Sequence, residues 1–179
     1  AMNGPTISGG AVASTNAYVT VNFSAAVYGN SGATAAVTAS SFSLAFSRNA
    51  GGATAVSIVG VANTSGGAVA AGATAVRILL SITGAPTGVE TVAIGPAGGS
   101  SIYNASGNAM VSAQTTGALL LNLASADYAW IGGTGNWSVA TNWLPEGVPG
   151  TTPEDTATIA SGTVTLDAAG SLASVTLSG

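Results

Sequence analysis

The segment WIGGTGNWSVATNWLPEGVPGTTPED, residues 130–155, decides how this chain is organised. It is rich in Gly, Asn and Pro, which favour turns, and it holds all three tryptophans of the protein, Trp130, Trp137 and Trp143. An Ala/Ser/Thr/Gly-rich block, residues 1–125, precedes it, and a short second block follows it. The segment therefore marks a change of architecture along the chain.

Composition excludes several classes of function. Only 4% of the residues are charged, and the formal net charge is −4. Arg48 and Arg77 are the only basic residues, so no basic surface can neutralise a run of phosphates, and we expect no nucleic-acid partner. The absence of cysteine and histidine excludes disulfides, thiolate-bound metals and histidine-dependent catalysis. No apolar run approaches the roughly 18 residues of a transmembrane helix, so no membrane span is expected.

The first block has the two-residue alternation of β-strands and lacks the spacing of apolar residues that marks an amphipathic helix. In the run 56–61 the alternation of apolar and polar residues shifts by one position at Gly60, which predicts a β-bulge. About seven strands joined by turns predict an antiparallel β-sandwich with one solvated face per sheet. The expected strands lie at 5–8, 18–23, 41–47, 56–61, 76–82, 91–94 and 119–123.

Four segments of this block resemble bacterial Ig-like repeats, which occur in large surface-exposed and adhesin-like proteins. The resemblance implies an Ig-like sandwich over residues 3–125 and a first domain at 1–125. Such repeats often carry Asp where this chain has Ser41 and Asn104, so their calcium binding is not carried over. The resembling segments are 19–24, 26–29, 88–92 and 101–110.

The tryptophan segment resembles the opening cap of the right-handed parallel β-helix in autotransporter-like and other bacterial surface proteins. This resemblance implies an all-β second domain, residues 126–179, made of a Trp-rich cap and the first coil or coils of a truncated β-helix. The residues that carry it are Trp130, Gly132, Gly133, Asn136, Trp137, Asn142, Trp143, Pro145, Pro149, Asp155, Ala157 and Ile159.

A short repeat follows the cap, since 164–166 (VTL) recurs as 175–177. Successive coils of a solenoid need such a repeat, because each coil buries its apolar side on the next. If coils continue, Leu166, Val175 and Leu177 lack their next neighbour here and leave an unpaired strand edge. We therefore expect residues 160–179 to pack back on the sandwich, to self-associate with another chain, or to be poorly ordered.

Two interpretations of the tryptophans remain open. The first coil of a solenoid has no preceding neighbour, so its open end needs a bulky apolar cover, and this structural reading is the favoured one. Alternatively, the aromatic rings stack on sugars while neighbouring amides bind the hydroxyls of a glycan or host surface. The candidate ligand-binding residues are Trp130, Trp137, Trp143, Asn136 and Asn142.

The acidic residues predict no catalytic site and no cofactor. Calcium needs six to eight oxygen ligands, and the chain has no D-x-D spacing. Glu154 and Asp155, the only adjacent acidic pair, stay as weak calcium candidates, although Asp155 is expected to accept backbone N–H groups in a turn. The spacing of Glu90 places its side chain on the apolar face of an expected strand. A buried ion pair with Arg77 is therefore a further possibility.

These features favour a structural role and not an enzyme. We expect a spacer module of a large secreted or surface-displayed bacterial adhesin-like protein, located outside the cell, that joins an Ig-like domain to a β-solenoid. One alternative is a carbohydrate- or host-surface-binding module that uses the tryptophans. A second is a non-catalytic part of a polysaccharide-active enzyme, because β-helices also host such enzymes.

Overall fold

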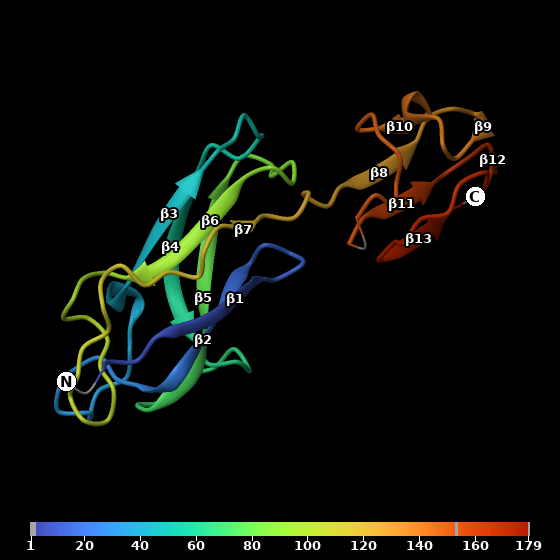
Figure 1. The fold of residues 1–179 in the computed structure, drawn as a ribbon. Coiled ribbons are helices and arrows are strands. Elements are labelled where there is room, and N and C mark those ends of the chain that lie inside the picture. Colours follow the sequence, from blue (N-terminus) through green and yellow to red (C-terminus); the bar gives the residue numbers. More distant parts are fainter. Residues whose placement is uncertain (1–2, 153, 179) are drawn as a thin grey trace. The chain divides into compact units, whose positions relative to one another are not determined.

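The computed structural model describes residues 3–152 and 154–178, and its regular structure is almost entirely β-strand (Figure 1). The chain forms two compact units, Ala1–Asn122 and Leu123–Gly179, whose boundary lies next to the expected one at residue 125. Two short 3-10 turns, η1 (Ala39–Ser41) and η2 (Ala140–Asn142), are the helical elements of the described part. None of the described helices has the length and apolarity to cross a membrane.

Unit 1 contains two antiparallel sheets. The strand order is β1-β2-β5-β4 in the first sheet and β3-β6-β7 in the second. The strands are β1 (Ile7–Val12), β2 (Tyr18–Val27), β3 (Phe42–Ser47), β4 (Ala55–Ala62), β5 (Ala73–Thr83), β6 (Thr91–Pro96) and β7 (Leu119–Leu120).

The predicted alternation is confirmed in β2. In β2, Val19, Val21 and Phe23 are buried, and the intervening positions are less so. The predicted bulge is also present, because the pairing of β4 with β5 shifts register between Ile58 and Gly60. Period-two patterning thus identified which face of each strand packs inward.

The inner faces of both sheets share one hydrophobic core. The rings of Phe23 on β2 and Phe42 on β3 stack with centroids 6.3 Å apart, which joins the two sheets directly. Burying each such side chain stabilises the fold by roughly 1.5–3 kcal/mol. The buried core consists of Val19, Val21, Phe23, Val27, Val37, Phe42, Val76, Ile78, Val92, Ile94, Ile102, Met110 and Leu121.

Two parts of unit 1 differ from the expectation. The first strand runs from Ile7 to Val12 instead of 5–8, because Gly9 and Gly10 pair with β2 and do not form a turn. A Cβ at Gly10 would lie 2.7 Å from the Thr116 methyl carbon, so the glycine lets the chain pass close over β1. Moreover, the irregular segment 97–118 supplies two buried core residues, Ile102 and Met110.

Unit 2 is built on parallel pairing. Strand β11 pairs in parallel with β8 on one side and with β13 on the other, and β12 pairs in parallel with β9. One antiparallel strand, β10, completes the larger sheet, whose order is β10-β8-β11-β13. The strands are β8 (Asp127–Trp130), β9 (Thr134–Asn136), β10 (Trp143–Leu144), β11 (Thr156–Ile159), β12 (Thr163–Thr165) and β13 (Ser174–Leu177).

The register shows that successive stretches of unit 2 repeat one path. Asp127 on β8 is the partner of Thr156 on β11, and Thr134 on β9 is the partner of Thr163 on β12. The same step of 29 residues separates the hydrogen-bonded side chains of Asp127 and Thr156. Both strand pairs keep this step, so the second pass of the chain stacks on the first, strand over strand.

Candidate functional site

The three tryptophans lie together in the interior of unit 2. Trp130 ends β8, and Trp143 begins β10 directly opposite it. The Trp143 ring meets those of Trp130 and Trp137 edge to face, with centroids 5.0 Å and 4.7 Å apart. Only 7%, 4% and 1% of the surfaces of Trp130, Trp137 and Trp143 are exposed. Their rings therefore pack against one another instead of presenting open faces to solvent.

Each indole N–H is also used inside the protein. Trp130 Nε1 donates to the Gly133 carbonyl at 3.3 Å, and Trp137 Nε1 donates to the Pro149 carbonyl at 3.0 Å. Trp143 Nε1 donates to the carbonyl of Trp137, also at 3.0 Å. Buried indoles normally need such partners. The cluster is thus a satisfied apolar core, without the exposed ring face that stacking on a sugar requires.

The two candidate asparagines have different positions. Asn142 is half-buried, and its side-chain amide donates to the Asn136 carbonyl at 3.2 Å. A Cβ at Gly132 or at Gly135 would lie 2.7 Å from the Asn142 side chain, so both glycines are needed for the amide to fit. Asn136 itself is exposed at the end of β9. Asn142 thus organises the turn around the tryptophans.

Strand β10 covers one edge of the stacked strands. It pairs antiparallel with β8 through Trp143↔Trp130 and Leu144↔Ala129, whereas β8 pairs in parallel with β11 on its other side. The two residues of β10 therefore cover the outer backbone edge of β8 at Ala129 and Trp130. This arrangement is what a cap on a stack of parallel strands needs.

Asp155 is almost fully buried at the start of β11, and its carboxylate is saturated with donors. It accepts hydrogen bonds from the backbone N–H groups of Ala126, Gly150 and Thr152 and from the hydroxyls of Thr151 and Thr152. Burial alone would raise its pKa, but these hydrogen bonds together hold the pKa below the ordinary value. The side chain accepts backbone N–H groups in a turn, as predicted.

The calcium candidates do not form a cation site in this geometry. A carboxylate has about four lone-pair positions, and the donors to Asp155 occupy them. Glu154 is half-buried next to it. Among residues 3–152 and 154–178, no group of three or more Asp, Glu, His or Cys side chains lies together in a way that could hold a metal ion.

A further carboxylate joins successive passes of the chain. Asp167 Oδ1 accepts from the Ser138 N–H at 2.9 Å, and Oδ2 accepts from the Ser138 hydroxyl at 2.6 Å. The hydrogen bonds from Ser138 lower the pKa of Asp167, which is exposed to solvent. The two residues are again 29 positions apart. This pair therefore has the same 29-residue offset as the parallel strand pairs, and it lies in the turn that follows β9.

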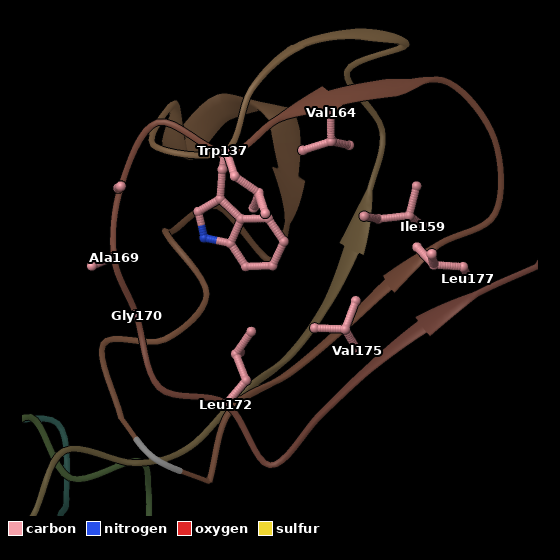
Figure 2. Close-up of a pocket in the computed structure, with 10 residues that line it drawn as sticks. Trp137, Ile159, Val164, Ala169, Gly170, Leu172, Val175 and Leu177 are labelled. Atoms are coloured by element: carbon pink, nitrogen blue, oxygen red, sulfur yellow. The ribbon is translucent and has the colours of Figure 1, made fainter.

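An apolar cavity of about 510 Å³ opens at the other end of the stack (Figure 2). The side chains of Trp137, Leu172 and Val175 point into it in the close-up. Its lining is almost wholly apolar and comes from Trp137 of the first pass and from the second and third passes of the chain. The lining residues are Trp137, Ile159, Val164, Leu166, Ala168, Ala169, Gly170, Leu172, Val175 and Leu177. Periodicity did not reveal this cavity, because it depends on how the strands stack.

Glu90 in unit 1 is fully buried, and its partners are mainly backbone N–H groups, with the Thr87 hydroxyl at 3.4 Å. Its carboxylate accepts N–H hydrogen bonds from Ala53 at 2.8 Å, from Thr87 at 3.0 Å and from Val89 at 3.2 Å. Burial by itself would raise the pKa, but the backbone hydrogen bonds outweigh it and lower the pKa of Glu90 to about 2. The carboxylate thereby ties the loop before β4 to the loop before β6.

Glu90 does not form the pair with Arg77 that the sequence left as a possibility. The guanidinium carbon of Arg77, a half-buried residue of β5, lies 4.4 Å from the centroid of the Tyr18 ring. It stacks on the aromatic ring as cations commonly do. A buried carboxylate can be satisfied by several oriented N–H groups without a cation, and a sequence pattern does not distinguish these two solutions.

Comparison of the chain with protein-family profiles, with curated proteins and with solved structures finds no match.

Proposed function

We propose that this chain is a structural spacer module of a large secreted or surface-displayed bacterial adhesin-like protein. In this proposal, residues 1–125 are an Ig-like sandwich, and residues 126–179 are the capped start of a right-handed parallel β-helix. The observation that carries the proposal is the common 29-residue step of two parallel strand pairs, together with the antiparallel β10 that covers β8. The first coil of a solenoid needs a cover on its outer side and a second coil stacked on its inner side.

The unit 1 geometry supports the first half of the proposal. Two antiparallel sheets share one core, and their inner faces come from alternating residues of the strands. Polarity at the surface comes from Ser, Thr and Asn, with 4% charged residues in the whole chain. Such a surface offers little electrostatic steering, so it suits a module that separates other parts of a protein better than one that recruits a charged partner.

The alternatives have less support. A glycan-binding module would need exposed aromatic faces, and the tryptophan rings and their N–H groups are occupied inside unit 2. For the polysaccharide-active enzyme, a catalytic part would place carboxylates together in a groove, whereas a non-catalytic part would not need them. Asp155 and Asp167 are instead each held by their own hydrogen-bond donors.

The test places the chain between a bacterial surface anchor and a terminal epitope, and measures how much antibody binds through the surface polysaccharide layer. We expect antibody binding to rise relative to the anchor joined directly to the epitope. A Trp143→Ala insert, which disrupts unit 2, should lose part of this gain. The same folded chain should show no saturable binding on a glycan array. Saturable glycan binding, or no gain in epitope access, would contradict the spacer role.

A further inference from the structure

The last residue of unit 1, Asn122, is bonded to the turn that joins β1 to β2. The side-chain amide of Asn16 bonds both backbone groups of Asn122. Its Oδ1 accepts from the Asn122 N–H at 2.8 Å, and its Nδ2 donates to the Asn122 carbonyl at 2.9 Å. In return, Nδ2 of Asn122 donates to the Ala13 carbonyl at 2.8 Å. We call these three hydrogen bonds the Asn16–Asn122 clamp.

The conformation of the turn places the Asn16 amide where it can reach Asn122. Asn16 has a φ of +59°, a left-handed conformation that asparagine adopts more readily than most residues. Its backbone N–H donates to the Ala13 carbonyl at 2.8 Å and closes the turn. Only 7% of Asn16 is exposed, so its amide is shielded from water that could replace Asn122 as a partner.

The clamp is the last of three contacts between the β1 side of unit 1 and the segment 114–122 (Figure 1). At the start of β1, the Ile7 N–H donates to Gln114 Oε1 at 3.3 Å. Farther along, a Cβ at Gly10 would lie 3.1 Å from a methyl carbon of Leu119. Residue numbers rise together along both segments through these contacts. The two segments therefore run parallel, side by side.

This parallel arrangement determines how unit 1 resists stretching. The chain enters β1 at Ile7 and leaves unit 1 after Asn122, at opposite ends of the two parallel segments. A stretching force therefore slides one segment along the other and loads the three contacts together, instead of breaking them one after another. Regular strand pairing contributes little at this place, because β7 forms two residue pairs with β6.

We propose that the Asn16–Asn122 clamp is a force-bearing lock, which keeps unit 1 folded when the chain is stretched between the parts of the protein on either side of it. The proposal rests on the spacer role, because a module held at both ends carries such a load. Survival under load depends on the rate of forced unfolding. The lock thus acts on the lifetime of folded unit 1, by resisting the sliding of Asn122 along β1.

Constant-force spectroscopy of the intact chain, held at its two ends, tests the proposal. The chain has no cysteine, so a cysteine added at each end provides a specific attachment point. Unit 1 is identified by its step, since it releases about twice the length of chain that unit 2 releases. Asn16→Gly removes the amide and keeps a residue that adopts positive φ without strain. We expect it to shorten the lifetime of unit 1 under load by about tenfold or more, because two hydrogen bonds of a buried side chain are lost.

Asn63→Ala is the matched control. The Asn63 amide also makes three hydrogen bonds to backbone groups, since it accepts from the N–H groups of Ser65 and Gly67 and donates to the Ala68 carbonyl. It lies in the turn between β4 and β5, outside the two loaded segments. Asn63→Ala should therefore lower the urea stability of unit 1, followed by circular dichroism, with less than a threefold change in its lifetime under load.

A second variant grades the effect. Asn122→Ala removes the bond to the Ala13 carbonyl and leaves both backbone bonds to Asn16, so its lifetime under load should lie between those of the wild type and Asn16→Gly. Equal lifetimes of the wild type and Asn16→Gly would overturn the proposal, as would equal shortening by Asn16→Gly and Asn63→Ala. Either result would leave the spacer role standing if the chain still raises epitope access, because that measurement does not depend on the clamp.

Discussion

Trp143 on β10 lies directly opposite Trp130 on β8, and their rings meet edge to face with centroids 5.0 Å apart. This pair connects β10, the antiparallel strand of the cap, to β8, the first of the parallel strands. All three tryptophans belong to unit 2, and their fluorescence therefore reports the folding of this unit alone.

Trp143→Ala should destabilise unit 2 by about 3–5 kcal/mol, because it removes the largest fully buried side chain and leaves a cavity. The measurement is urea unfolding followed by tryptophan fluorescence. Ile131→Ala, at an exposed position in the same segment, is the control and should change stability by less than about 0.5 kcal/mol. A Trp143→Ala protein as stable as the wild type would show that the ring is not part of the unit 2 core.

Glu90→Gln should alter how the stability of unit 1 depends on pH. The pKa of about 2 in the folded protein lies below the ordinary value of 4.5, so the ionised carboxylate stabilises the fold fully above pH 4.5. This stabilisation is lost as the pH falls from 4.5 towards 2. Urea unfolding followed by far-ultraviolet circular dichroism should show a steeper loss across this window in the wild type than in Glu90→Gln.

At pH 7 the Glu90→Gln substitution should be destabilising, because the new amide group cannot accept all the N–H groups that the carboxylate accepts. Glu146→Gln, at an exposed carboxylate, is the matched control and should leave stability at pH 7 unchanged. Equal pH curves for wild type and Glu90→Gln would contradict the assigned role of the carboxylate.

Gly162→Ala should destabilise unit 2 more than Gly133→Ala does. Both glycines have positive φ, at +100° and +66°, so each alanine costs about 1–2 kcal/mol of backbone strain. A Cβ at Gly162 would also lie 2.0 Å from the Gly133 carbonyl oxygen, whereas a Cβ at Gly133 meets open space. Thermal unfolding followed by tryptophan fluorescence should rank the wild type first, Gly133→Ala second and Gly162→Ala last. The reverse order of the two variants would show that the close approach of the stacked turns is not required.

Asp155→Asn should destabilise unit 2 by about 1–3 kcal/mol, because an amide group would face donors that now meet a carboxylate oxygen. Millimolar calcium should leave the melting temperature of the wild type unchanged, since the lone pairs of Asp155 are already occupied. Differential scanning calorimetry with and without calcium measures both effects. A rise in melting temperature with calcium that Asp155→Asn abolishes would establish a calcium site and contradict this reading of the carboxylate.

Local patterns predicted the parts of the fold that depend on neighbouring residues. The alternation of Val19, Val21 and Phe23 identified the buried face of β2, and Gly60 identified a bulge. They did not predict that Ile102 and Met110, in a segment without strand periodicity, complete the core. Their burial depends on contacts with distant parts of the chain, since Tyr103, next to Ile102, pairs with Tyr28.

The sequence by itself determined that the protein is all-β, that its architecture changes at the tryptophan segment, and that histidine, cysteine and basic-surface chemistry are excluded. Those conclusions follow from composition and from period-two spacing, which act locally. Only the tertiary structure decided that Trp130, Trp137 and Trp143 turn inward and that Glu90 is held mainly by backbone N–H groups. The physical reason is that burial and hydrogen bonding of these groups depend on which separate segments pair, such as β8 with β10 and the loop at Ala53 with Glu90, and a local pattern carries no information about that pairing.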